Sequence, residues 1–501
     1  MASDEFLRRL AKVEALRESG VDPYPVHVDR DHTLAELREA HGALAAGEET
    51  DVSVRVAGRL LLIRRQGKLT FATLRDGTGT VQLFVSQKEL GEERHGAFDE
   101  LDLGDWLAVE GTVMATRKGE LSVKVREFVL LAKALRPIPK WHGLADVDTR
   151  YRQRYADLIV NEHARRVFEI RHACITAVRE LLAARGFIEV ETPVLHDQAG
   201  GAPARPFLTY HNALDLDLVL RIALELHLKR LIVAGYEKVF ELGRVFRNEG
   251  LGTRHNTEFT MLELYQAFAD YHDMMQITEE LVSHAARVAT GSTLIDSEAG
   301  RLELAPPWPR RPMLELVEEA TGVAVHPSMP IDRLEALADA HEVAREPGWG
   351  PGKLILELNE KLVEPNLAGP VFVTDYPREV SPLARAHRDD PLLVERFEVV
   401  VHGRELANAY SELNDPVDQR RRFEVQAALK AAGDLEANDV DEDYLRAMEY
   451  GMPPTGGMGM GIDRMVMLIA GVSTIREVIL FPQLRPEAPG EGEPEAFEGD
   501  G

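Results

Sequence analysis

The sequence holds only one cysteine, Cys174, among its 501 residues. A single thiol excludes an intrachain disulfide, so we expect the reducing cytoplasm as its compartment. Cys174 falls within the apolar spacing of a predicted helix, which favours a buried structural role. The Cys and His spacing of a zinc site is also absent, and neither G-x-S-x-G nor H-E-x-x-H occurs.

Long apolar runs are missing as well. No stretch of about 18 uncharged apolar residues occurs, which excludes a transmembrane helix. The first residues alternate basic and acidic side chains, which is typical of an amphipathic helix and not of a secretory leader. The hydrophobic fraction of 45% is ordinary, and the length allows two or three domains. We therefore expect a multidomain soluble protein without a membrane partner.

Basic charge is scarce, with 58 Lys and Arg against 84 Asp and Glu and a net charge of −26. Taken alone, this balance argues against a nucleic-acid partner, because phosphate binding needs basic surface. Local basic clusters such as Arg64, Arg65 and Lys68 can override it, although solvated surface charge is the alternative. Residues 485–501 are rich in acids, Gly and Pro, so we expect a disordered tail there.

The N-terminal third changes period along its length. Residues 4 to about 45 have near-helical apolar spacing, whereas from Val52 the spacing becomes that of strands. Five short strands predict a small β-barrel: 52–56, 69–74, 80–85, 106–112 and 120–131. With Val81 and Leu83 pointing inward, Gln82 and Phe71 point outward. Such aromatic and polar pairs read unpaired bases in oligonucleotide-binding barrels, and ordinary exposed aromatics on a sandwich are the alternative.

A larger domain follows a Pro-rich linker near residues 135–140. The 3-4-3-4 apolar spacing predicts a helix over residues 164–185 that ends at Gly186. Residues 187–192 then predict a strand that ends at Pro193. Alternating strands and helices continue to about residue 484.

Residues 244–265 are the most informative segment, because alternation places their polar chemistry on one face of a predicted hairpin. The strands of that face hold Arg247, Glu249, Phe259, Met261, Glu263 and Tyr265, and the loop holds Arg254 and His255. Guanidinium forks bind phosphate, a ring stacks on adenine, and a carboxylate accepts from the adenine amine. The segment therefore suits a nucleoside triphosphate, with a salt-bridged surface hairpin as the alternative.

Two further elements carry chemistry. In residues 456–465 glycines end a predicted strand, and Arg464 begins an apolar helix. Arg464 could make a cation–π contact with adenine, and a purely structural strand-to-helix turn is the alternative. In residues 397–412 a tight turn at His402 and Gly403 pairs Val400 with Glu405. Glu398 and Glu405 then share a face and suit Mg²⁺. Asn408 and Glu412 join them only if the strand has a bulge, and an acidic solvent-facing hairpin is the alternative.

These elements together resemble the class II aminoacyl-tRNA synthetases, and in detail the bacterial-type lysyl-tRNA synthetases. The sequences Gly186-Phe-Ile-Glu-Val-Glu-Thr-Pro193, Phe246-Arg-Asn-Glu249 with His255-Asn-Thr-Glu-Phe259, and Gly459-Met-Gly-Ile-Asp-Arg464 resemble that family's motifs 1, 2 and 3. The resemblance implies an α+β fold, with an OB-fold barrel ahead of an antiparallel sheet flanked by helices. It divides the chain into residues 1–50 (helical extension), 51–135 (anticodon-binding barrel), 136–160 (linker), 161–484 (catalytic domain) and 485–501 (acidic tail).

The resemblance also implies roles for single residues. Arg247, Glu249 and Arg464 would be catalytic. ATP would contact Arg247, Glu249, Arg254, His255, Phe259 and Arg464. Lysine would contact Glu225, Glu263, Tyr265, Asn408 and Glu412. Glu398 and Glu405 would bind Mg²⁺, and Arg64, Phe71, Gln82 and Glu120 would read the anticodon.

The implied activity is ATP-dependent activation of L-lysine and its transfer to lysine tRNA by a homodimer built through motif 1. Three positions depart from the family pattern: Leu224 replaces a proline, His227 an aromatic residue and Ala409 a glycine. They leave a specialised or inhibitor-resistant second synthetase copy open.

Three rival functions share parts of this pattern. A lysine ligase that modifies a translation factor has the same catalytic domain but normally lacks the barrel. A non-catalytic RNA-binding homologue is expected to have lost Arg247, Glu249 or Arg464, and all three are present. A lipid lysyltransferase fusion would need membrane spans.

Overall fold

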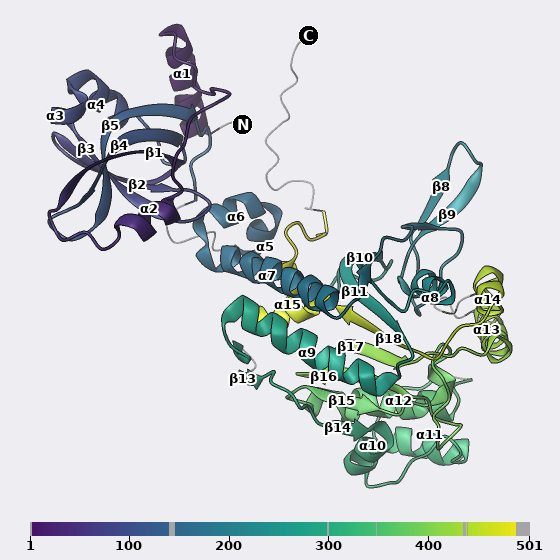
Figure 1. The fold of residues 1–501 in the computed structure, drawn as a ribbon. Helices are drawn as coiled ribbons and strands as arrows, with labels where there is room; N and C mark the ends of the chain where they lie inside the picture. Colours follow the sequence, from purple (N-terminus) through teal and green to yellow (C-terminus); the bar gives the residue numbers. More distant parts are fainter. Residues whose placement is uncertain are drawn as a thin grey trace. The chain divides into compact units, whose positions relative to one another are not determined.

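The computed structural model describes residues 3–139, 146–297, 300–346, 348–433, 437 and 439–486. The chain divides into two compact units, Met1–Ala145 with Pro486–Gly501, and Asp146–Arg485 (Figure 1). Each unit has its own hydrophobic core. The acidic tail expected at residues 485–501 falls almost entirely outside the described residues. None of the described helices is long and apolar enough to cross a membrane.

The first unit is a closed five-stranded barrel in the order β1-β2-β3-β5-β4. Its strands are β1 (Glu49–Gln66), β2 (Leu69–Arg75), β3 (Thr80–Ser86), β4 (Trp106–Ala115) and β5 (Leu121–Ala132). Burial alternates along β2 and β3, so that Val81, Leu83 and Val85 fill the core. The barrel predicted from period-two spacing is confirmed, including which side chains face inward.

Helices surround the barrel: α1 (Asp4–Glu18), α2 (Leu34–His41), α3 (Gln87–Leu90) and α4 (Glu92–Asp99). The residues from 4 to about 45 that were predicted to be helical form two separate helices, because α1 ends at Glu18 and α2 begins only at Leu34. Pro23 and Pro25 lie between them, and proline removes a backbone donor and blocks helical continuation.

An eight-stranded sheet forms the centre of the second unit, in the order β14-β15-β16-β17-β18-β11-β10-β6. Its strands are β6 (Ile188–Glu189), β10 (Lys238–Phe246), β11 (Glu258–Ala267), β14 (Arg310–Pro312), β15 (Val371–Thr374), β16 (Arg396–Val401), β17 (Arg404–Ser411) and β18 (Thr455–Gly461). Only the two outermost pairs, β14 with β15 and β10 with β6, are parallel. The antiparallel sheet flanked by helices is therefore confirmed.

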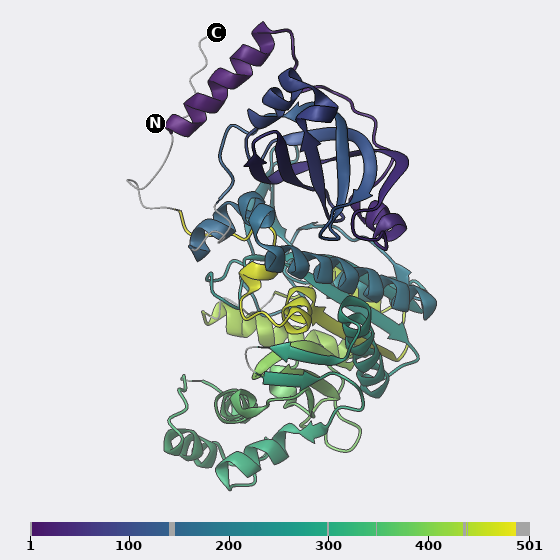
Figure 2. The same ribbon diagram turned by 90° about the vertical axis from the view of Figure 1, so that its left-hand side faces the viewer.

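Three helices cover one face of this sheet: α7 (Glu162–Ala184), α9 (Tyr271–Thr290) and α15 (Ile462–Ala470) (Figure 2). Their apolar stripes share a core with β11, β17 and β18. The predicted helix at residues 164–185 is confirmed, and Gly186 follows its end with φ of 81°, which favours glycine. Cys174 is fully buried in α7, and burial raises the pKa of its thiol to about 12.

The strand predicted over residues 187–192 is much shorter, since β6 holds only Ile188 and Glu189. Beyond it, the backbone N–H and hydroxyl of Thr192 donate to Glu241 Oε2 at 3.1 and 2.6 Å. A side-chain acceptor thus replaces the strand ladder just before Pro193.

The remaining elements complete the second unit. A three-stranded sheet and a two-stranded sheet comprise β7 (Leu195–His196), β8 (Leu208–His211) and β9 (Leu216–Leu220), and β12 (Leu294–Ser297) and β13 (Gly300–Glu303). The helices are α5 (Val147–Arg152), α6 (Arg154–Val160), α8 (Glu225–Val233), α10 (Met313–Thr321), α11 (Ile331–Ala340), α12 (Pro351–Leu362), α13 (Pro416–Ala431), α14 (Glu442–Met448) and α16 (Ile475–Val478). Two 3-10 turns are η1 (Glu364–Asn366) and η2 (Arg378–Val380). Helices α10, α11 and α12 pack around a core that they share with β15 and β16.

Candidate active site

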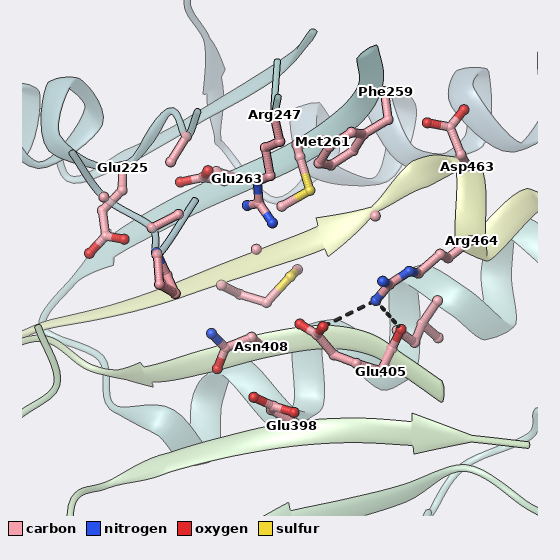
Figure 3. Close-up of a pocket in the computed structure, with 18 of the residues that line it drawn as sticks. Glu225, Arg247, Phe259, Met261, Glu263, Glu398, Glu405, Asn408, Asp463 and Arg464 are labelled. Atoms are coloured by element: carbon pink, nitrogen blue, oxygen red, sulfur yellow. Dashed lines mark hydrogen bonds and ion pairs between the residues drawn. The ribbon is translucent and has the colours of Figure 1, made fainter. Parts of the chain in front are cut away.

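A pocket of about 430 Å³ opens on the sheet face formed by β11, β17 and β18 (Figure 3). The start of α8, the loop after β10 and the start of α15 complete its walls. It brings together every residue predicted to bind ATP, lysine or metal: Glu225, Arg247, Glu249, Arg254, His255, Phe259, Glu263, Tyr265, Glu398, Glu405, Asn408, Glu412 and Arg464. Segments nearly 240 residues apart in sequence thus line a single cavity.

The β10–β11 hairpin supplies one wall of the pocket. Its register pairs Val245 with Phe259 and Glu241 with Glu263, so Phe259, Glu263 and Tyr265 share the pocket face as predicted. The prediction that Arg247 lies on the strand is wrong, because β10 ends at Phe246.

Beyond β10 the chain follows a loop instead of the ladder. Arg247 N still donates to Thr257 O at 2.9 Å. Asn248 N donates instead to Arg205 O, and Glu249 N donates to Arg247 O within the loop. The exposed Glu249 side chain reaches the pocket from this loop.

Arg247 and Phe259 are in contact at one end of the pocket. The Arg247 guanidinium carbon lies 5.2 Å from the centroid of the Phe259 ring, and Nε donates to Ile222 O at 3.3 Å. A cation over a ring face is favourable and holds both side chains at the pocket wall.

Arg464 points into the same end from α15. Its Nη1 donates to the backbone carbonyl of Glu405 at 2.8 Å and to Glu405 Oε2 at 3.1 Å (Figure 3). The neighbouring Asp463 accepts from Thr260 N at 2.7 Å and pairs with Arg171 at 2.5 Å. Asp463 thereby fixes the start of α15 against β11 and so positions Arg464.

The opposite end of the pocket is lined by acidic side chains that are almost fully buried. Glu225, Glu263 and Glu412 are each at most 5% exposed. The fully buried Lys229 forms ion pairs with both Glu225 and Glu412. Burial alone would lower the pKa of Lys229, but the two carboxylates raise it, so Lys229 stays charged. Two of the three carboxyl groups therefore share one fixed cation.

Hydrogen bonds orient these carboxyl groups. Tyr410 donates to Glu225 Oε1 at 2.7 Å, and Tyr265 donates to Glu263 Oε2 at 3.1 Å. Burial, reinforced by Glu225, raises the pKa of Glu263 to about 7. The pKa of Glu412 is also raised well above its usual value by burial, against the opposing charge of Lys229. The acidic end is short of positive charge and suits a cationic ligand.

Small residues of β18 make room for these groups. A Cβ atom added at Gly457 would lie 2.0 Å from Glu412 Oε1 and 2.5 Å from the Tyr265 ring. At Gly459 the nearest atom would be Met261 Cε at 3.5 Å. Gly457 is therefore required for the packing of the acidic end, whereas a Cβ atom at Gly459 would make only ordinary van der Waals contacts with protein atoms.

The β16–β17 hairpin brings Glu398, Glu405, Asn408 and Glu412 to one site. Val400 pairs with Glu405 across the His402–Gly403 turn, as predicted, and both turn residues have positive φ. The register then shifts, so that Glu398 pairs with Asn408. This irregularity next to Leu406 is the bulge that strict alternation required.

Glu398 and Glu405 lie beside arginines and a further carboxyl group. Arg396 pairs with Glu398 at 2.5 Å and donates to Asn408 Oδ1 at 3.0 Å. Burial and then Glu405 raise the pKa of Glu398 to about 7, and burial and then Glu398 raise that of Glu364 to about 8. Carboxyl groups therefore crowd one another here, and a cation would favour their ionised forms.

The described residues contain no group of three or more His, Cys, Asp or Glu side chains arranged to hold a metal ion. Mg²⁺ commonly takes only one or two protein carboxylates and completes its shell with phosphate oxygens and water. Glu398 and Glu405 fit that pattern together with a bound triphosphate.

Comparison with known proteins decides the family. A model of class II tRNA synthetases (D, K and N) matches residues 146–485, and a model of OB-fold nucleic acid binding domains matches residues 54–131. Lysine–tRNA ligases of Moorella thermoacetica and Synechococcus sp. strain RCC307 are each 53% identical, covering 97% and 96% of this chain and 98% and 96% of the relatives. That of Trichormus variabilis is 52% identical over 97% of this chain and 89% of its own length. The chain belongs to the class II lysyl-tRNA synthetases.

The three departures from the synthetase pattern have visible structural consequences. Leu224 N donates to Glu263 Oε1 at 2.9 Å, a bond that proline has no hydrogen to make. His227 packs against His196 with ring centroids 4.6 Å apart and the rings tilted by 36°, and burial lowers the pKa of His227 to about 4. Ala409 is fully buried between β16 and β18.

The anticodon-reading residues expected of a lysyl-tRNA synthetase lie on the barrel unit. Arg64 pairs with Phe71 across β1 and β2, and its Nη2 lies 3.5 Å from Gln82 Oε1. Phe71 is directly opposite Phe84, so Gln82 is its diagonal neighbour. Glu120 is exposed in the turn before β5, 4.0 Å from Arg38.

The sequence did not single out Lys229, Tyr410, Arg396 or Arg171 of this synthetase. Lys229 lies four residues after Glu225 in α8, a spacing that places both on one helix face and was a usable signal. Tyr410 and Arg396 reach the pocket through the β17 bulge and the β16–β17 pairing. No local pattern encodes those two features.

Proposed function

We propose that the pocket activates L-lysine with ATP and then transfers the lysyl group to the 3′ end of lysine tRNA. The observation that carries this proposal is one cavity with two chemically distinct ends. Arginines and an aromatic ring lie at one end, and three buried carboxyl groups with one fixed cation lie at the other. The two ends suit a nucleotide and a diamino acid.

At the nucleotide end, Arg247 contacts the α-phosphate and Glu249 accepts from the adenine amine. Phe259 and Arg464 enclose the adenine ring, while Arg254 and His255 hold the outer phosphates. The positions of all six side chains in the pocket wall support this assignment. Planar guanidinium forks match phosphate oxygens, and the Arg464–Glu405 contact holds the Arg464 guanidinium at the pocket wall.

At the acidic end, the lysine ammonium groups contact Glu225, Glu263 and Glu412, with Tyr265 and Asn408 completing the pocket. The charge balance supports lysine over aspartate or asparagine, because an acidic side chain would meet further carboxylates and a neutral one would leave them unpaired.

The mechanism needs no protein nucleophile. A lysine carboxylate oxygen attacks the α-phosphorus, the bond from that phosphorus to the bridging oxygen breaks, and pyrophosphate leaves with the electron pair. The 3′ hydroxyl of tRNA then attacks the lysyl carbonyl and releases AMP. Arg247 stabilises charge on the α-phosphate oxygens, and the buried carboxylates hold the substrate amine in line.

Magnesium is the proposed metal, held by Glu398 and Glu405 together with phosphate oxygens. It would neutralise phosphate charge when bound. The raised pKa of Glu398 and the excess of carboxyl groups around it support a cation there.

Assembly and tRNA binding are further parts of the proposal. Arg64, Phe71, Gln82 and Glu120 read the anticodon, and the domains divide as residues 1–50, 51–135, 136–160, 161–484 and 485–501. A homodimer through motif 1 is supported by the open edge at β6 and by Ile188 and Leu195, which are 50% and 47% exposed. The free thiol of Cys174 fits a cytoplasmic location.

Charging of a lysine tRNA transcript tests the proposed function. We expect radiolabelled lysine to become acid-precipitable on this transcript and not on an aspartate tRNA transcript. A lysine ligase acting on a translation factor would form the adenylate without charging tRNA, so adenylate formation with no charging would refute the proposal.

A further inference from the structure

A second cavity of about 480 Å³ adjoins the nucleotide end of the active-site pocket. Five residues line both cavities: Arg254, His255, Glu405, Leu406 and Arg464. The second cavity adds His402 and Arg404 from the β16–β17 turn. Its remaining wall is mostly apolar and includes Val401, Met467, Leu468 and Val472. Basic side chains thus continue from the first cavity into the second.

Positive charge in this cavity is poorly compensated. Among the residues that the structure describes, Arg254 and Arg404 form no ion pair with a carboxylate, although acids outnumber bases in the chain. Glu405 is a carboxylate in the cavity wall, but it is paired with Arg464. Burial and then Arg254 and Arg464 lower the pKa of Arg404, so the guanidinium groups crowd one another. An anion between them would relieve this repulsion.

Two nitrogen atoms of residues that line this cavity have no hydrogen-bond partner. Arg404 Nε and His402 Nε2 are both buried without a hydrogen-bond partner, and Arg404 Nη1 makes only a 3.4 Å contact with Ser473 O. Buried donors in native proteins are normally satisfied, so unpaired ones indicate a ligand or water. A guanidinium with free N–H groups is well suited to phosphate oxygens.

We propose that this second cavity receives the pyrophosphate leaving group, and that Arg404 is the residue that binds it there. The inference rests on the proposed function, in which Arg254 and His255 hold the outer phosphates of ATP. Once the bond to the α-phosphorus has broken, pyrophosphate moves from these two residues toward Arg404. The apolar wall limits water around the anion and strengthens its attraction to the guanidinium groups.

The test is the dependence of lysine-dependent ATP–pyrophosphate exchange on pyrophosphate concentration. Loss of a charge-assisted hydrogen bond predicts that Arg404→Met raises the KM for pyrophosphate about ten-fold. The KM values for ATP and lysine stay at the wild-type level, and Arg404→Lys recovers part of the pyrophosphate affinity. The matched control is Arg333→Met, which removes an exposed arginine of α11 and leaves all three KM values unchanged.

Direct titration of inorganic pyrophosphate into the full-length protein gives a second measurement that does not need catalysis. We expect weaker binding in Arg404→Met than in wild type, with the same thermal unfolding midpoint. Equal pyrophosphate affinity in both proteins would overturn the inference, as would a parallel rise in the KM for ATP. Absence of lysine-dependent exchange in the wild-type protein would instead refute the proposed function, so the two failures are distinguishable.

Discussion

Glu263 illustrates how burial sets the chemistry of a single residue in this pocket. It is 4% exposed, accepts hydrogen bonds from Tyr265 and Leu224 N, and has a pKa of about 7. A carboxylate of this kind is only partly ionised near neutral pH. An ammonium group beside it would stabilise the ionised form, so under the proposed function lysine binding and deprotonation of Glu263 are coupled.

The pH dependence of lysine binding follows from this coupling. The raised pKa means that the carboxyl group is mostly protonated below pH 7 and mostly ionised above it, and only the ionised form attracts ammonium. We expect the KM for lysine to fall as pH rises from 6 to 8, by about ten-fold for one group with this pKa. Steady-state kinetics would check this, and Glu263→Gln should give a higher KM for lysine that changes less with pH. A wild-type KM that rises with pH would contradict the assignment.

Lys229 is a pocket residue whose role could not be predicted from the sequence. The acidic residues of the pocket could be predicted by resemblance, but the fixed cation between Glu225 and Glu412 could not be ranked above other helix lysines. Its i,i+4 spacing from Glu225 indicated a shared face without indicating burial. The charge balance of the acidic end becomes visible only in three dimensions.

At the scale of elements, strand β18 controls how closely the acidic side chains approach the sheet. Its glycines leave the space that Glu412 and Tyr265 occupy over Gly457. The same strand turns directly into α15 and thereby delivers Arg464 to the other end of the pocket. One element therefore shapes both ends of the pocket.

The substitution Gly457→Ala tests this role. A methyl group there would overlap Glu412 Oε1 and the Tyr265 ring, and overpacking of this kind costs about 1–3 kcal/mol. We expect the KM for lysine to rise about ten-fold or more, with a smaller effect on the KM for ATP. Gly96→Ala in α4, where an added Cβ atom would have no neighbour within 4 Å, is the control and should behave like wild type. Equal kinetics of the two variants would show that Gly457 does not shape the lysine end.

Element boundaries were harder to predict than element types. The inward face of the barrel strands and the span of α7 followed from their apolar periods. The predicted strand extended beyond Phe246 because the alternation of side chains continues after the backbone hydrogen bonds of the β10–β11 ladder have ended. The bulge beside Leu406 was identified only as a requirement, since no local signal marks its position.

At the scale of the whole molecule, two compact units are assigned separate tasks. The barrel unit presents Arg64, Phe71 and Gln82 on neighbouring strands, and the larger unit contains the complete pocket. The order of these units was predictable because their hydrophobic periods differ. Periodicity alone did not predict the pocket, because its walls come from the loop after β10 and from β11, β16, β17 and β18, which are far apart in sequence.

Because anticodon reading and lysine activation are assigned to different units, Phe71→Ala should impair tRNA charging and leave lysine activation unchanged. Loss of base stacking, worth about 1–3 kcal/mol per base, should lower kcat/KM for charging of lysine tRNA about ten-fold. Lysine-dependent ATP–pyrophosphate exchange without tRNA should not change. Charging at the wild-type rate would show that Phe71 does not stack on the anticodon.

A single pocket that joins ATP and lysine is central to the proposed function, and lysine-dependent ATP–pyrophosphate exchange tests it most directly. We expect exchange with lysine and none with aspartate or asparagine. Arg247→Ala should abolish exchange, because the α-phosphate loses its charged partner, while Arg333→Ala on α11 should retain it. Absence of lysine-dependent exchange by the wild-type protein, or undiminished exchange by Arg247→Ala, would contradict the proposed function.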